Sequence, residues 1–443
     1  LASRTKWDSG WPLIGVRESV NSDLPCYQTG ETNNSNDELL PLKFALGENG
    51  ETIKNNAKNN NNRSCDYQFI SLIEKTQVEG LWPVDHPLPF PCWETEAKKP
   101  LRLDSLGKYQ EVVTAIEGHL QSMLEERKYN TIGNFLEFYS AYKNSQCENL
   151  SEFFSSYYPR ITSEHHTCVG LALELWQRLS KITSQTVPIS QHLFMVSCEE
   201  NLDCPDEYAN FGYDLDKYVD TLEKEHVLLA LKIEMNGRNG VLLCDPGYHI
   251  GRVVTVMEDG EYPQTGWFVQ SQESNLTKEY NYAFSLINRS FVAWQERNTR
   301  NGLVQATSTA LIYVAKPYVT AVDVTERRNL VYNFRSLLQR DPKGHLVAGI
   351  YFKIKENFDE FTIFFQDNGA KKRIKLNFAS FLNPDRVNQS ILDLIKKCTQ
   401  QMKMVENELL DTVVNIANVL VDKHFVIQML EINNAINLIT EDN

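Results

Sequence analysis

The stretch HVLLALKIEMNGRNGVLLCDPGY, residues 226–248, contains the clearest local structural signal in the chain. Two apolar runs flank NGRNG, a sequence rich in residues that tolerate positive φ, and this arrangement predicts a β-hairpin. His226 begins the first predicted strand and Asp245 ends the second. Strands of about seven residues around a short turn would bring these two side chains to the same end of the hairpin. The pattern therefore predicts a carboxylate that can orient an imidazole.

A cysteine precedes this hairpin at the start of a predicted helix. In SEHHTCVGLALELWQRL, residues 163–179, Cys168 is followed by apolar residues at helical spacing. Unpaired backbone N–H groups at a helix start and a nearby imidazolium both stabilise a thiolate. Thiol catalysis also needs a base and a group that fixes the tautomer of that base. We therefore interpret Cys168 as the candidate nucleophile, His226 as its base and Asp245 as the orienting group.

The pattern along the chain predicts an α+β fold with five segments. An N-terminal helical bundle is followed by an antiparallel β-barrel or sheet, an α/β lid and a helical C-terminal extension. The long apolar pattern near the C-terminus lacks heptad regularity, which favours packing back on the body. The predicted segments are an irregular Asn/Pro-rich extension (1–103), a helical subdomain with Cys168 (104–190), a β-rich subdomain with His226 and Asp245 (191–320), a lid-like α/β subdomain (321–385) and the C-terminal extension (386–443).

Composition excludes some classes of function. The net charge of −14 argues against a general binder of nucleic acid or anionic membranes. No run approaches the roughly 18 apolar residues of a membrane span. The nine cysteines are an odd number without the spacing of a disulfide scaffold, which favours a soluble, reduced, cytoplasmic protein. The first residues do not resemble a signal peptide, although a secretion signal already removed stays an alternative.

The order of Cys168, His226 and Asp245 resembles that of the arylamine N-acetyltransferases, which belong with the transglutaminase-like and papain-like thiol enzymes. The motifs that carry the resemblance are HHTCVGLALELW, HVLLAL and LLCDPGY, and residues of about 283–338 resemble the family's barrel and lid region. The resemblance covers about 104–385. It implies a papain-like Cys-His-Asp arrangement and an acyl-cysteine intermediate. It also implies acetyl-CoA or a related acyl-CoA as co-substrate, with a small-molecule amine as acceptor.

The residues before the cysteine depart from the family. Where the family usually has Arg-Gly-Gly, this chain has Glu164-His165-His166-Thr167. We regard five residues as candidates for the substrate pocket: His165, His166, Thr167, Gly247 and Tyr248.

No metal site is predicted, because the paired spacing of metal ligands is absent. A glycine-rich phosphate loop is also absent, so CoA would use scattered cations such as Arg252 or Lys316.

Two alternatives stay open. The departures and the terminal extensions also suit a catalytically silent protein that binds a protein partner through those extensions. The same three residues would equally serve a transglutaminase-like or hydrolytic thiol enzyme.

Overall fold

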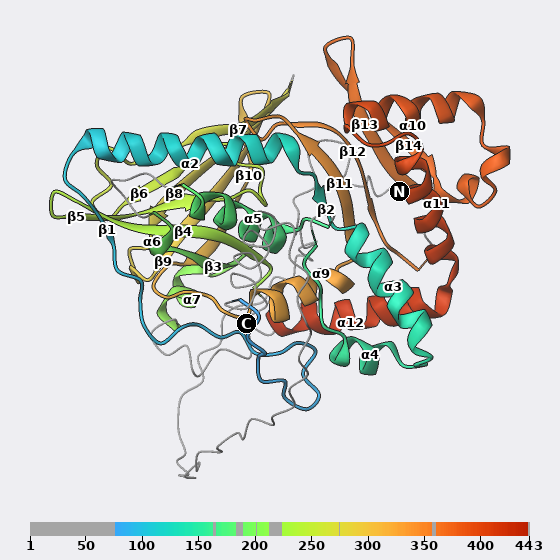
Figure 1. Ribbon diagram of the computed structural model, residues 1–443, viewed down its shortest axis with the longest axis horizontal. Coiled ribbons are helices and arrows are strands. Elements are labelled where there is room, and N and C mark those ends of the chain that lie inside the picture. The colour runs from blue at the N-terminus through green and yellow to red at the C-terminus, as the bar shows by residue number, and fades with distance from the viewer. Residues whose placement is uncertain are drawn as a thin grey trace, which may run out of the picture.

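The computed structural model describes residues 76–441 apart from 163–164, 183–188, 201, 212–223, 274 and 357–359. Most of the predicted irregular extension, residues 1–75, lies outside the described residues, and so does part of the acidic stretch between Cys198 and His226. The described chain is a mixed α+β fold built on two antiparallel sheets with helices around them (Figure 1).

The larger sheet has nine strands and carries the hairpin. Its order is β6-β5-β4-β3-β10-β9-β8-β7, and the short strand β1 pairs parallel with the far end of β4. The sheet curls into a half-barrel, because strands near its two ends, β6 and β8, come into contact. The strands are β1 (Leu101–Leu103), β3 (Leu193–Glu199), β4 (His226–Met235), β5 (Arg238–Cys244), β6 (Val254–Met257), β7 (Phe268–Glu273), β8 (Leu276–Phe284), β9 (Phe291–Arg300) and β10 (Leu303–Tyr313).

The smaller sheet has five strands in the order β14-β13-β12-β11-β2. Its edge strand β2 lies immediately before helix α3 (Gly133–Ser145), so this sheet joins the N-terminal helices to the C-terminal half of the protein. The strands are β2 (Tyr129–Asn130), β11 (Phe334–Arg340), β12 (Leu346–Lys353), β13 (Glu360–Asp367) and β14 (Ala370–Asn377).

Helices cover both sheets and bury separate apolar cores. In Figure 1, α2 crosses the larger sheet, while α10, α11 and α12 lie on the side of the smaller one. The first core lies between the larger sheet and α2 and α5, and the second lies between the smaller sheet, α3, α4 and the C-terminal helices. The helices are α2 (Leu106–Glu126), α3 (Gly133–Ser145), α4 (Leu150–Ser156), α5 (Cys168–Ser180), α6 (Ile189–His192), α7 (Pro205–Phe211), α9 (Arg327–Val331), α10 (Gln389–Gln401), α11 (Glu408–Val421) and α12 (Lys423–Glu441).

The predicted hairpin is present as β4 and β5. Asn236 and Gly237 form its turn with φ values of 53° and 78°, a region that Asn and Gly tolerate. Leu229 pairs with Cys244, so the start of β4 and the end of β5 lie side by side. This register places His226 and Asp245 at the same end of the hairpin.

The predicted lid-like α/β subdomain (321–385) begins with a short helical segment. A π-helical turn, η2 (Ala321–Glu326), leads into the short helix α9, and the chain then continues as strand β11. Six of the seven residues of β11 (FRSLLQR) are buried, polar and charged ones included, so both faces of this strand are covered.

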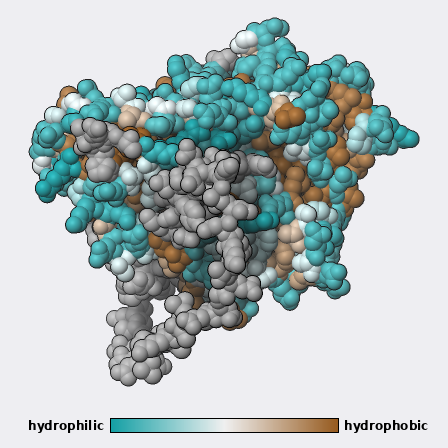
Figure 2. Space-filling view, viewed as in Figure 1, coloured by the Kyte–Doolittle hydropathy of each residue, from teal (hydrophilic) through white to brown (hydrophobic). Residues whose placement is uncertain are grey.

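The C-terminal extension packs on the body and contributes many side chains to the second core. None of the helices in the described segments alone has the length and apolar character to cross a bilayer, and only the bent pair Glu408–Val421 and Lys423–Ile439 meets that criterion jointly. Figure 2 shows a largely hydrophilic face, with apolar residues gathering on the side where Figure 1 places α10 and α11.

Candidate functional site

Cys168 is the first residue of α5, as the sequence predicts, and only 2% of its surface is exposed. Thr167 precedes it in an extended conformation, and the Thr167 carbonyl accepts the hydrogen bond from the Leu171 N–H. The Thr167 hydroxyl does not cap the helix, because it donates to the carboxylate of Glu326 instead. The first backbone N–H groups of α5 therefore lie beside the thiol without a side-chain cap.

The imidazole of His226 joins Asp245 to this thiol. Its Nε2 atom lies 3.0 Å from Asp245 Oδ2, and both side chains are buried. The Cys168 thiol lies close enough to the same ring to contribute to the raised pKa of His226. Since Asp245 occupies Nε2, the ring nitrogen left for the thiol is Nδ1. The structure thus brings the three predicted residues close together.

The electrostatics around His226 favour a charged imidazole. Burial alone would lower the pKa of His226, but the Asp245 carboxylate and the Cys168 thiol outweigh it and raise the pKa well above the usual value. Nearby, burial raises the pKa of the Tyr129 hydroxyl well above 10, and the charge of Cys168 adds to this shift. An imidazolium beside a sulfur is the arrangement that keeps a thiolate at neutral pH.

The turn after β5 packs directly on the thiol and the imidazole. The Asp245 carboxylate accepts from the Tyr248 N–H at 2.9 Å, which fixes the turn to the same group that orients His226. A Cβ atom on Gly247 would lie 2.7 Å from His226 Cε1 and 2.8 Å from Cys168 Cβ. This position therefore requires glycine because of close packing.

A buried carboxyl supports the start of α5 from the other side. Glu326, at the end of η2, accepts from the Thr167 hydroxyl and from Asn134 Nδ2, the latter at 2.8 Å. Burial raises the pKa of Glu326 to about 7, although both hydrogen bonds lower it. Three residues later in the chain, Asn329 Nδ2 approaches Cys168 Sγ at 4.0 Å. The η2–α9 segment thus contacts both Thr167 and Cys168.

The two histidines before Cys168 face away from the turn that carries Tyr248. His166 Nε2 lies 2.8 Å from Glu174, and His165 Nδ1 lies 3.4 Å from Glu137. Hydrogen bonds from His166, Arg127 and Arg178 lower the pKa of Glu174 to about 2 against the effect of burial. Both histidines border a separate hollow of about 620 Å³ beside α3 and α11. By pairing with Glu174 and Glu137, the two histidines anchor the loop before Cys168.

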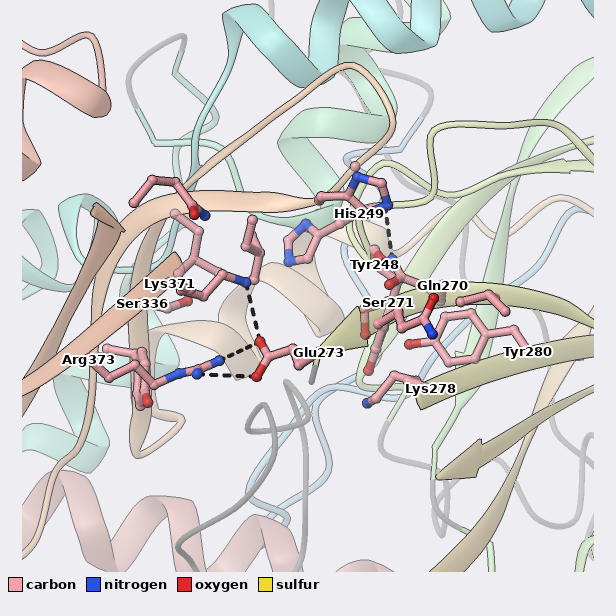
Figure 3. Close-up of a pocket in the computed structure, with 18 of the residues that line it drawn as sticks. Tyr248, His249, Gln270, Ser271, Glu273, Lys278, Tyr280, Ser336, Lys371 and Arg373 are labelled. Atoms are coloured by element: carbon pink, nitrogen blue, oxygen red, sulfur yellow. Dashed lines mark hydrogen bonds and ion pairs between the residues drawn. The ribbon is translucent and has the colours of Figure 1, made fainter. Parts of the chain in front are cut away.

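A larger cleft of about 810 Å³ opens between the two sheets (Figure 3). The turn residues Tyr248 and His249 form one part of its wall, β7 and β8 a second, and β11 and β14 a third. The cationic side chains that line it are Lys278, Lys371 and Arg373.

Glu273 on β7 holds the last two of these cations. Its carboxylate lies 2.7 Å from Arg373 and 3.4 Å from Lys371, both on β14, so the ion pair joins edge strands of the two sheets. Burial lowers the pKa of Lys371 to about 8. Lys278 is likewise paired, with Glu296 at 2.9 Å, so the cleft combines three ion-paired cations with a neighbouring thiol.

The candidate pocket residues divide into two groups. Tyr248 lines the cleft, and Gly247 lies between it and the thiol, whereas His165 and His166 border the other hollow and Thr167 is buried against Glu326. Neither of the proposed CoA-binding cations lines the cleft, and the Arg252 guanidinium stacks 5.0 Å from the Phe268 ring.

Sequence reasoning missed several residues of this site. Its polar members come from strands and turns far along the chain, namely His249, Lys278, Glu326, Arg340, Lys371 and Arg373. The sequence did carry one signal for this site, because the polar residue His249 directly follows the DPGY turn.

Within the described residues no group of His, Cys, Asp and Glu side chains could hold a metal ion. No model of a known protein family matches the chain, and no curated protein matches it.

Proposed function

We propose that this protein is an arylamine N-acetyltransferase-like thiol acyltransferase, in which Cys168 accepts an acyl group from a CoA thioester and passes it to an amine. The observation that carries the proposal is the buried His226–Asp245 pair beside Cys168 at the start of α5. A papain-like arrangement of these residues is part of the proposal.

The reaction has two balanced halves. The Cys168 thiolate attacks the thioester carbonyl, the C–S bond to the donor breaks, and the His226 imidazolium protonates the departing CoA thiolate. The amine then attacks the acyl-cysteine, a C–N bond forms and the bond to Cys168 breaks. The amine proton passes to His226, which restores the ion pair with the thiolate. Asp245 keeps His226 oriented throughout, and backbone N–H groups at the start of α5 are placed to stabilise the oxyanion.

The cleft between the sheets is the proposed route for the donor. Lys278, Lys371 and Arg373 supply positive charge to a chain with net charge −14, which suits a phosphorylated donor such as acetyl-CoA. The residues that would hold the donor's phosphates are therefore on β8 and β14, while its thioester would approach Cys168 past Gly247 and Tyr248.

Burial of the thiol favours one second candidate. With 2% of its surface exposed, Cys168 also fits a catalytically silent protein whose extensions bind a partner. The same site on an amide or ester would make a hydrolytic or transglutaminase-like enzyme, and the experiment below separates all three.

The test measures labelling of individual cysteines by iodoacetamide between pH 5.5 and 9, and acyl-enzyme formation with acetyl-CoA. Burial raises the pKa of Cys244 and Cys398 to about 12, so these thiols serve as internal controls for slow labelling. We expect Cys168 to label fastest below pH 7.5 and Cys168→Ala to abolish acylation. If Cys168 labels no faster than the other thiols, both the acyltransferase hypothesis and the hydrolytic or transglutaminase-like hypothesis are rejected. Fast labelling without acylation by acetyl-CoA would instead favour the hydrolytic or transglutaminase-like reading.

A further inference from the structure

A second histidine, His249, borders the cleft close to the thiol. It follows Gly247 by two residues in the turn that packs on Cys168 and His226, and its ring lines the cleft wall together with Tyr248 (Figure 3). The ring centroid of Tyr129 lies 5.5 Å from that of His249 in an edge-to-face contact. His249 therefore occupies the side of the cleft that is nearest to the thiol.

The backbone holds His249 in an uncommon conformation. Its φ is 61°, in the left-handed region that residues other than glycine seldom adopt. A Cβ atom on Gly344 would lie 1.7 Å from the His249 carbonyl oxygen, and Gln270 Nε2 donates to the same oxygen at 3.1 Å. Such strain persists only where surrounding structure imposes it, and it concentrates at functional sites.

A buried arginine fixes which ring nitrogen of His249 carries the proton. Arg340 NH1 lies 3.3 Å from His249 Nδ1, and the same guanidinium donates to the carbonyls of Pro246 and Arg127 at 2.8 and 2.7 Å. Arginine only donates hydrogen bonds, so Nδ1 must accept and the proton must reside on Nε2. The tautomer of His249 is therefore set by the protein before any ligand binds.

The ring also stays uncharged. Burial lowers the pKa of His249 well below its usual value, and the charges of Arg340, His226 and Lys278 lower it further. Among the described residues, no side chain or backbone group is hydrogen bonded to His249 Nε2. By contrast, His226 Nε2 and His166 Nε2 each lie within 3.0 Å of a carboxylate. His249 thus presents an oriented, neutral N–H donor at the cleft wall.

We propose that His249 is a substrate-contacting residue whose Nε2–H donates a hydrogen bond to a carbonyl oxygen of the molecule that acylates Cys168. This inference rests on the proposed acyl transfer. A neutral donor suits a carbonyl oxygen, which gains partial charge as the thiolate attacks, whereas the phosphates of the donor match the cations on β8 and β14. His249 would accordingly select ligands by a carbonyl group.

The test compares His249→Gly, His249→Gln and the wild type with p-nitrophenyl acetate, a small ester that acylates thiols. Glycine adopts the left-handed conformation without strain, and Gln146 has a φ of 59° in this chain, so both replacements suit the backbone. The Gln amide places an N–H about as far from the backbone as His Nε2. His424→Gln, at an exposed position on α12, is the matched control. Thermal unfolding checks that every variant is folded.

We expect the rate of acyl-Cys168 formation to fall at least about tenfold in His249→Gly and to stay within about threefold of wild type in His249→Gln. Alkylation of Cys168 by iodoacetamide, in which the thiolate displaces iodide at the CH2 carbon and no oxyanion forms, should remain unchanged in both. Wild-type acylation rates in His249→Gly would overturn the inference. An equal loss in His249→Gln, or a parallel loss of alkylation, would also overturn it, because either indicates a structural role. Absence of acylation in the wild type itself would instead reject the proposed function.

Discussion

Replacing Gly247 by alanine tests the contact on which the proposed chemistry depends. The added Cβ would lie 2.7 Å from His226 Cε1 and 2.8 Å from Cys168 Cβ. Carbon atoms pack at about 3.5–4.0 Å, so one of the two side chains must move by about 1 Å. Overpacking of this kind costs about 1–3 kcal/mol of unfolding free energy. A displacement of about 1 Å at reacting groups can lower a rate by about a hundredfold.

The measurement is the rate at which iodoacetamide alkylates Cys168, resolved by mass spectrometry, at pH 6.5 and pH 9.5. In Gly247→Ala we expect this rate to fall at least about tenfold at pH 6.5, because a thiol separated from its imidazolium is scarcely ionised there. The difference should shrink at pH 9.5, where free thiols ionise unaided. Gly118→Ala is the matched control, because a Cβ at that position on α2 meets nothing within 4 Å. A folded Gly247→Ala protein with the wild-type rate at pH 6.5 would refute the role of the Cys168–His226 contact.

Two further predictions concern Glu326 and Glu273. Folding raises the pKa of Glu326 from 4.5 to about 7, so the folded chain retains a proton that the unfolded chain loses, and stability falls as pH rises through this range. Glu326→Gln should therefore be more stable than wild type at pH 8 by up to about 3 kcal/mol and similar to it at pH 4.5, as measured by urea unfolding; an equal difference at both pH values would contradict this. Glu273→Gln should release Arg373 and Lys371 and lower the KM for acetyl-CoA about threefold or more with kcat unchanged. The control is Glu360→Gln, because Glu360 forms an exposed ion pair with Lys375 on the neighbouring strand. A higher KM in Glu273→Gln would contradict the prediction and would mean that the Glu273 ion pair maintains the shape of the cleft.

Local signals in the sequence were sufficient to predict the core of the site. The hairpin turn at Asn236-Gly237 fixes the register of β4 and β5, and this register alone brings His226 and Asp245 together. The start of the helix at Cys168 could also be predicted, because apolar residues at helical spacing begin there. Turn chemistry and periodicity report short-range structure, which is sufficient for the His226–Asp245 pair and for the helix start, whereas the approach of Cys168 to the hairpin depends on the packing of α5 on β4.

The surroundings of the site could not be predicted in the same way. His165 and His166 are adjacent to Cys168 in sequence, yet their side chains pair with Glu137 and Glu174 beside a different hollow. Two of the three cations of the cleft, Lys371 and Arg373, lie on β14, whose place opposite β7 follows from how two whole sheets pack. Periodicity indicates which residues are buried, but it does not indicate which distant strand they face.

The η2–α9 segment connects the described parts of both terminal extensions to the candidate site. On the N-terminal side, the Gly80 N–H donates to the Asp323 carboxylate at 2.8 Å, and on the C-terminal side, Arg328 donates to Asn437 of α12 at 3.1 Å. Between these anchors, Glu326 contacts Thr167 and Asn329 contacts Cys168. Any shift of this segment would therefore displace both the start of α5 and a neighbour of the thiol. Contacts from both ends of the described chain thus converge on the residues that position the proposed nucleophile, so the described parts of the two extensions support the candidate site.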